Sequence, residues 1–200
     1  MAIQQTLRPF RDYSEKDVIN LFSVSGAPID TTYNIIATKG SLVKVVGSGF
    51  QNDQDPEVLL GNYGLFNTNN FVGQRYGVPS QVALANSGDF AIGMLLFDVR
   101  ELDENGEFLK YRPQKAAEME AVLSGQSAPI VTKGRFLVSG IQTGTTAIAA
   151  GGAVYVGTNG GLATFTNVTG QRVGTFLGVA GTTGSYGDGT TTALIQLAIF

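Results

Sequence analysis

The chain has 200 residues, of which 43% are hydrophobic and only 14% are charged, and its formal net charge is −3. This apolar content is enough for a sizeable core, and the weakly negative charge disfavours nucleic acid as a partner. The absence of cysteine and histidine excludes disulfides, thiolate metal sites and most hydrolase mechanisms. We therefore expect a protein that is not an enzyme and that holds no cofactor.

Glycine and threonine dominate the turns, and 27 glycines occur without a collagen-like period. This composition favours many short strands joined by tight turns. We predict a mainly β fold of small β-barrel or β-sandwich (β-tulip-like) modules, with one short packing helix and an extended N-terminal arm. The expected segments are the arm (1–30), a β-rich core (31–141) and a Gly/Thr-rich β module (142–200), with the alternative that the last two form one intertwined domain.

The N-terminal arm begins with an extended stretch at residues 6–10. Ser14 then starts a capping-box-like sequence, and Val18, Leu21 and Phe22 follow at helical spacing, which predicts a short helix. Such an arm can lie on a neighbouring subunit or cover its own core, and the sequence leaves both open. It lacks the apolar segment of a secretory signal, and no apolar run approaches bilayer length, so we expect a cytoplasmic product without a membrane partner.

A strand at residues 42–46 leads into a long polar connection at residues 47–80. Within it, Asp53, Asp55 and Glu57 offer oxygen ligands that suit a hard cation such as Ca²⁺. The glycine and distal glutamate of a calcium loop are missing, so we expect a solvated loop rather than a metal site.

The middle of the chain carries the clearest short-range signals. Residues 90–99 are apolar at nearly every position, which predicts a central strand. Asn105-Gly106 predicts a β-hairpin, with the acidic residues Asp103, Glu104 and Glu107 as solubilising charges at its exposed tip.

Pro113 opens a predicted helix over residues 113–124. Ala116, Met119 and Leu123 share one face of it, which indicates packing on a sheet. Gly125 is placed to end the helix.

The C-terminal third alternates strand and turn signals. A strand at residues 130–141 contains Gly134, where we expect a break or bulge. Further strands are predicted at residues 153–156, 162–166, 172–180 and 193–200. The last of these is apolar on both faces, which predicts that it is buried in a sheet or between subunits.

Residues 87–99 (Ser-Gly-Asp-Phe-Ala-Ile-Gly-Met-Leu-Leu-Phe-Asp-Val) precede the hairpin, the proline-led helix and residues 134–141 (Gly-Arg-Phe-Leu-Val-Ser-Gly-Ile). This order of features resembles the head decoration proteins of lambda-like tailed bacteriophages, and residues 150–157 and 173–180 look like related phage cement proteins. The resemblance implies a virion protein, often a homotrimer, that binds the outside of the capsid and bridges major capsid protein subunits. Lambda-type decoration proteins are shorter, so residues 1–28, 47–80 and the C-terminal module would be additions.

A cement protein needs apolar anchors on extended segments. The candidate capsid or subunit contacts are Leu7, Phe10, Tyr13, Phe22, Phe50, Tyr63, Phe66, Phe71 and Tyr76. Two other functions stay open: a phage tail, baseplate or head-fibre component, which shares the Gly/Thr-rich composition, and a carbohydrate-binding β module. The absence of tryptophan counts against the last.

Overall fold

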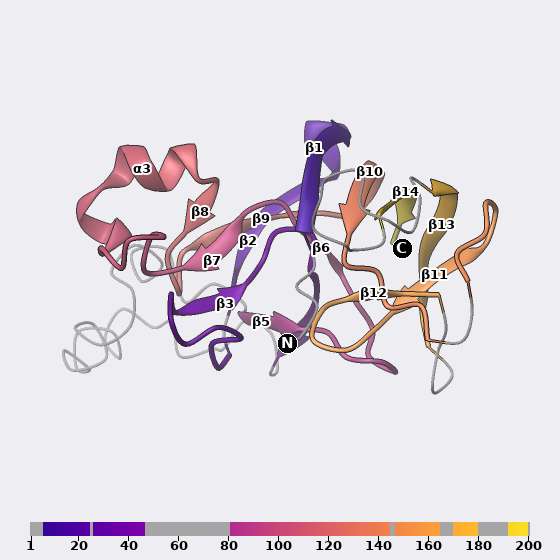
Figure 1. Ribbon diagram of the computed structural model, residues 1–200, viewed down its shortest axis with the longest axis horizontal. Coiled ribbons are helices and arrows are strands. Elements are labelled where there is room, and N and C mark those ends of the chain that lie inside the picture. The colour runs from indigo at the N-terminus through magenta and orange to yellow at the C-terminus, as the bar shows by residue number, and fades with distance from the viewer. Residues whose placement is uncertain are drawn as a thin grey trace, which may run out of the picture.

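A computed structural model describes residues 6–24, 26–46, 81–144, 147–164, 170–179 and 192–199. The described residues form three sheets, one of them a closed barrel, so the fold is mainly β as predicted. The three lie in a row along the longest axis of the molecule, with the barrel in the middle (Figure 1).

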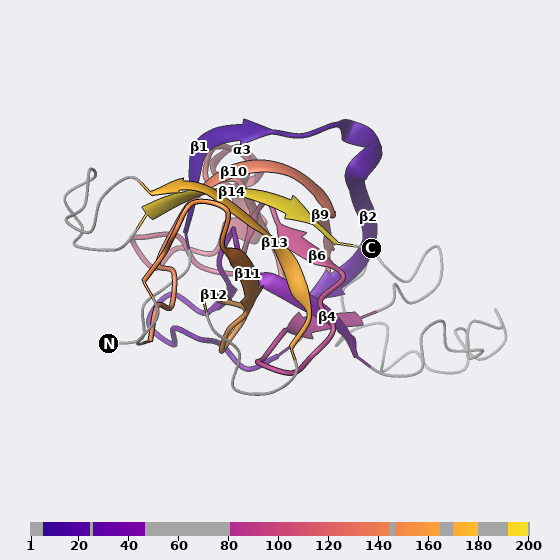
Figure 2. The same ribbon diagram turned by 90° about the vertical axis from the view of Figure 1, so that its right-hand side faces the viewer.

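The largest sheet has six strands and is antiparallel throughout. In spatial order they are β1 (Thr6–Asp12), β10 (Lys133–Ser139), β14 (Thr192–Ala198), β13 (Arg172–Val179), β11 (Ala153–Val156) and β12 (Leu162–Ala163). Figure 2 shows these strands following one another from β1 at the top to β12 below, so the sheet is strongly curved. The C-terminal strand β14 is buried between β10 and β13, which confirms the prediction of a buried final strand.

The barrel closes through five strands. They are β2 (Val18–Val24), β5 (Gln81–Leu84), β4 (Leu42–Val46), β6 (Gly93–Leu95) and β9 (Ser127–Val131). Gly93 lies where β6 pairs with β9: a Cβ there would collide with the Ile130 side chain and would lie 2.8 Å from the Val131 carbonyl oxygen. Glycine therefore lets these two neighbouring strands approach closely.

Neighbouring residues of the barrel strands face two different cores, because successive side chains of a strand point to opposite faces. Val43, Leu95 and Ile130 fill the lumen with apolar residues from the other barrel strands. Leu42, Met94 and Val131, each next to one of these in sequence, pack instead against the six-stranded sheet. Burial on both faces explains why residues 90–99 are apolar almost without interruption.

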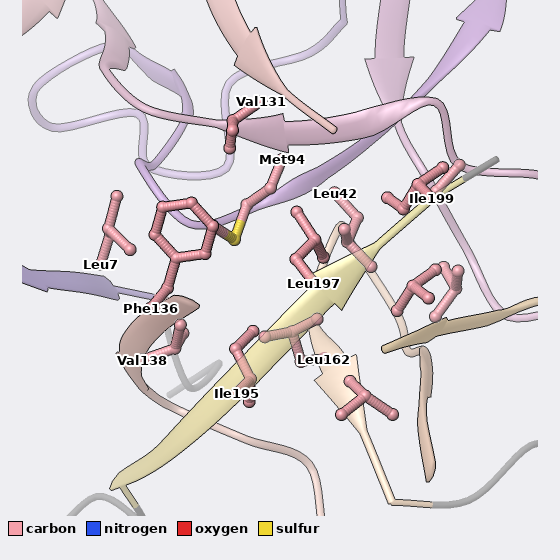
Figure 3. Close-up of a cluster of buried hydrophobic side chains, with 14 of the residues drawn as sticks. Leu7, Leu42, Met94, Val131, Phe136, Val138, Leu162, Ile195, Leu197 and Ile199 are labelled. Carbon is pink, nitrogen blue, oxygen red and sulfur yellow. The ribbon is translucent and has the colours of Figure 1, made fainter. Parts of the chain in front are cut away.

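The core between the barrel and the six-stranded sheet gathers residues from both ends of the chain. Figure 3 shows the Phe136 ring of β10 between Leu7 of β1 and Met94 of the barrel. Leu197 of β14 lies in the same cluster. Leu7 is 2% exposed, so the N-terminal segment covers its own core.

A turn of the C-terminal segment also docks on the barrel. The amide of Gly160 donates to the Ala85 carbonyl oxygen at 2.7 Å, and the Leu42 amide donates to the Gly160 carbonyl oxygen at 2.7 Å. The Asn159 amide donates to Oδ1 of Asn86 at 2.9 Å. The six-stranded sheet itself takes strands from residues 1–30, 31–141 and 142–200, so chain positions 30 and 141 do not separate the sheets.

The third sheet has three short strands and carries the described α-helix. Its strands are β3 (Ile35–Ala37), β7 (Asp98–Arg100) and β8 (Ala121–Val122). The helix α3 (Pro113–Glu118) precedes β8, and the 3-10 helix η2 (Leu109–Tyr111) precedes α3. These elements form the end of the molecule opposite the six-stranded sheet (Figure 1).

One helix prediction is wrong, and a second is correct at its start, Pro113, but wrong in its length. The segment after Ser14 forms one 3-10 turn, η1 (Glu15–Asp17), and then strand β2, because its β-branched and aromatic residues pair with the neighbouring barrel strand β9. The helix predicted over residues 113–124 ends at Glu118, and none of its residues is buried. Glu120 has a φ of +51°, which stops the helix, and the chain continues as β8 beside β7.

Two predicted strands are divided. Residues 90–99 contain β6 and the start of β7, which belong to different sheets. Residues 130–141 are divided at Thr132 between β9 and β10, two residues before the break expected at Gly134. The predicted hairpin keeps its turn at Asn105-Gly106, but its arms are reduced to the single bridge between Leu102 and Phe108.

Candidate interaction surface

The predicted contact residues differ in how exposed they are, and five of them lie outside the described residues. Leu7 lies inside the core and offers no surface to a neighbour, whereas Phe10 is 51% exposed on β1. Tyr13 stacks on buried Phe136 with ring centroids 5.8 Å apart, and Phe22 packs against the lumen core of the barrel. Outside the described residues lie Phe50, Tyr63, Phe66, Phe71 and Tyr76, together with the candidate metal ligands Asp53, Asp55 and Glu57.

Among the described residues, two exposed aromatic side chains that share a neighbour lie on the segment before α3. Phe108 is 50% exposed and Tyr111 is 75% exposed. The ammonium of Lys110 lies 5.1 Å from the Phe108 ring centroid and 4.8 Å from the Tyr111 ring centroid, within cation–π range of both. We call Phe108, Lys110 and Tyr111 the aromatic platform.

Three residues anchor the segment that carries the platform: the buried Leu109 and the ion pair between Glu107 and Arg112. Leu109 points inward and is 1% exposed, and its amide donates to the Glu101 carbonyl oxygen at 2.9 Å. Glu107 and Arg112, the residues that flank the platform, form a double ion pair with contacts of 2.6 and 2.9 Å. The buried Leu109 side chain and this ion pair thus anchor the backbone of the loop that carries the two exposed rings.

Asp103 organises the turn before the platform. Its side chain is fully buried, where the sequence had indicated an exposed charge at a hairpin tip. Oδ1 accepts hydrogen bonds from the amides of Asn105 (2.7 Å) and Glu107 (2.8 Å), and Oδ2 pairs with Lys115 of α3. The Lys115 ammonium and the Glu107 amide lower the pKa of Asp103 to about 2, and Asp103 raises the pKa of Lys115.

The amide of Gly106 donates to the Asp103 carbonyl oxygen at 3.2 Å, and the Asp103 amide donates to the Glu107 carbonyl oxygen at 2.9 Å. Gly106 has a φ of +80°. This combination is a type I turn followed by a glycine bulge. An aspartate in the first position of such a turn can satisfy its amides, which is why Asp103 turns inward.

A second ionic cluster ties this end of the molecule to strand β1. Arg11 of β1 makes a bidentate pair with Glu120 (2.9 and 2.6 Å), and Lys39 adds a contact of 2.9 Å to the same carboxylate. The Arg11 guanidinium lowers the pKa of Glu120. Asp98 lies beside this cluster and accepts from the Lys39 amide at 2.7 Å, and its burial raises its pKa.

These charged clusters are arranged for structure. Asp103 and Glu120 each neutralise cations and hold neighbouring segments together. Among the described residues, no group of three or more His, Cys, Asp or Glu side chains is placed to hold a metal ion. The aromatic platform exposes two rings and a cation that a partner can contact.

The sequence pattern does not indicate this platform, because residues 107–111 fit the second arm of the predicted hairpin. A usable signal was present: Phe108 and Tyr111 are three residues apart, have Lys110 between them, and are bracketed by the oppositely charged Glu107 and Arg112. In a strand, this spacing would place the two rings on opposite faces. In the 3-10 turn that forms, both rings contact one ammonium.

The fold defines a mainly β protein built around a five-stranded barrel. No protein-family model matches the chain, and no curated protein or solved structure matches it. Within the part of the chain that the structure describes, no helix is long and apolar enough to cross a membrane.

Proposed function

We propose that this protein is a non-enzymatic virion component that binds the outside of a tailed-phage capsid and bridges major capsid protein subunits. The proposal starts from the resemblance of residues 87–99 and 134–141 to head decoration proteins. In the structure these residues form barrel and sheet strands whose side chains build the two cores. They supply the scaffold, and the contacts with the capsid come from loops that the scaffold presents.

The observation that carries the proposal is the aromatic platform. Exposed aromatic residues held rigidly on a surface are typical of the few residues that dominate binding energy at protein interfaces. Leu109 and the Glu107–Arg112 pair anchor the backbone of this loop, which lowers the entropic cost of ordering the loop on binding. Lys110 between them adds a cation for a carboxylate or carbonyl group of the capsid surface.

A single platform is small for a stable protein interface. A decoration protein does not need a large one, because a lattice presents many identical sites and an oligomer engages several at once. A homotrimer with three platforms would gain avidity in this way.

The test is co-sedimentation of the purified protein with expanded, undecorated phage capsids. We expect saturable binding, and we expect the double variant F108A/Y111A to lower the apparent affinity by about 30-fold or more. The matched control is F90A, which removes a ring that is 79% exposed on another loop and should leave binding unchanged. Deletion of residues 1–28 is unsuitable as a test, because it would remove β1 and β2 from their sheets.

Two results would overturn the proposal. The first is absence of binding to capsids by wild-type protein that is a stable trimer in solution, which would favour a tail, baseplate or head-fibre component. The second is equal loss of binding in F90A and F108A/Y111A, which would remove the platform as the contact.

One observation favours a carbohydrate-binding function as a second candidate. Tyr111 exposes 75% of its surface beside a second aromatic ring, and such rings form stacking platforms for sugars. Binding of the wild-type protein to a glycan panel, lost in Y111A and kept in F90A, would support this candidate over capsid decoration.

A further inference from the structure

The chain contains two Asn-Gly pairs, Asn105-Gly106 and Asn159-Gly160. In such pairs the glycine amide nitrogen can attack the asparagine side chain, since glycine has no Cβ to obstruct the approach. The structure places the two pairs in different surroundings.

The reaction needs a glycine nitrogen that is free to move. It attacks Cγ of the asparagine, a new C–N bond closes a five-membered succinimide, and the Cγ–Nδ2 bond breaks with release of ammonia. Water then opens the ring at either carbonyl and leaves aspartate or isoaspartate. Water is the single co-reactant, and no oxidant or reductant is involved.

Gly106 meets these requirements. It is exposed, and a Cβ built on it would find nothing within 4 Å, so no neighbouring segment packs against this glycine. Its amide donates to the Asp103 carbonyl oxygen at 3.2 Å, at the long end of hydrogen-bond distances. Asn105 is also an exposed residue of the turn.

Gly160 does not meet them. It is buried, and its amide donates to the Ala85 carbonyl oxygen at 2.7 Å. A Cβ built there would lie 2.9 Å from the Leu42 carbonyl oxygen and 2.9 Å from the Leu84 side chain. Ring closure at Asn159 therefore requires this turn to detach from the barrel first.

We propose that Asn105 is a site of spontaneous deamidation and isomerisation, and that the fold protects Asn159. The product at Asn105 adds a negative charge beside Glu104 and Glu107. Isoaspartate also inserts a methylene into the backbone between two amides that Asp103 Oδ1 accepts, those of Asn105 and Glu107. The aromatic platform is therefore displaced as the protein ages. The effect of this displacement on capsid binding rests on the proposed function.

The experiment follows both sites in the full-length protein by peptide mass spectrometry after incubation in mildly alkaline buffer made with heavy-oxygen water. Label incorporated on ring opening distinguishes reaction during incubation from earlier damage. We expect Asn105 to convert about tenfold faster than Asn159 or more, because reaction at Asn159 requires local opening. The variant N105Q should abolish conversion at that position and leave the rate at Asn159 unchanged, because the six-membered ring from glutamine closes slowly.

A parallel incubation in denaturant separates the effect of the fold from that of neighbouring sequence. We expect the two rates to become similar when the chain is unfolded. Equal rates in the folded protein, a faster rate at Asn159, or a ratio that is the same in denaturant would each overturn the proposal. None of these readouts involves the capsid, so failure here is distinct from failure of the proposed function.

Discussion

The same substitution should destabilise the protein at one glycine of strand β13 and not at another. A Cβ at Gly174 would collide with the backbone carbonyl oxygen of Gln196, and would lie 3.2 Å from its carbonyl carbon and 3.3 Å from Cα of Leu197. These atoms belong to the backbone of β14, which is fixed between two strands and cannot move like a flexible side chain. G174A therefore has to separate β13 from β14 or strain both.

The expected cost follows from the crowding. Overpacking of a well-packed core costs about 1–3 kcal/mol, and a collision with backbone falls at the upper end, at about 2–3 kcal/mol. For a protein of this size, 1 kcal/mol corresponds to about 2–4 °C in Tm, so we expect G174A to lower Tm by roughly 5–10 °C. Gly178 of the same strand has nothing within 4 Å of a built Cβ. G178A should leave stability unchanged or raise it by up to about 1 kcal/mol, through the reduced entropy of the unfolded chain.

The assay is urea unfolding of the wild type and both variants, followed by circular dichroism, with Tm from calorimetry as a second measure. Equal stabilities of G174A and G178A, or a larger loss in G178A, would refute the β13–β14 packing from which the prediction is calculated.

Two further predictions concern the ionic clusters. Asp103 has a pKa of about 2 in the folded protein, below its usual value of 3.8, so its ionised form stabilises the fold. That stabilisation is complete above about pH 5 and is lost as the pH falls from about 4 to 2, so the stability difference between wild type and D103N should shrink over this window in acid unfolding experiments. A stability difference between wild type and D103N that stays constant with pH would contradict this prediction. E120Q should lower the free energy of unfolding by about 1 kcal/mol, because Arg11 and Lys39 keep their charges and lose a partly exposed carboxylate. The control is E104Q, which alters a carboxylate 3.8 Å from Lys115 and should lower the free energy of unfolding by less than half as much. Equal losses in E104Q and E120Q would show that the contacts of Glu120 with Arg11 and Lys39 add no particular stability.

The sequence predicted well those features that depend on local pattern and burial. The apolar stretch at residues 90–99 and the apolar C-terminus both indicated central strands, and β6 and β14 are buried within their sheets. The Asn105-Gly106 turn was also correct, because its glycine supplies the positive φ that the bulge requires. In each of these cases the local sequence is sufficient to predict the structure of the segment.

The errors arose where distant partners decide the structure. Residues 18–24 have a helical spacing of apolar side chains, yet they form β2 because β9, more than a hundred residues later, offers a strand to pair with. The sequence indicates Asp103 as a solvated charge, whereas in the structure Lys115 and two backbone amides surround its carboxylate. The division of residues 130–141 at Thr132 follows from two sheets that share one continuous segment, which no local pattern encodes.

The candidate contacts depend on tertiary structure in the same way. Leu7 lies on the N-terminal segment that the sequence predicts as an exposed arm, and it is part of the core. Exposure of Phe108 and Tyr111 depends on Leu109 pointing inward and on the Glu107–Arg112 pair, that is, on the shape of one turn.

The central claim is that the aromatic platform contacts the capsid. The most direct measurement places a photo-crosslinking amino acid at position 111, and in a parallel sample at position 90, and irradiates capsids saturated with each protein. We predict a crosslink from position 111 to the major capsid protein and none from position 90. Saturated capsids that give no crosslink from position 111, or equal crosslinking from both positions, would contradict the account.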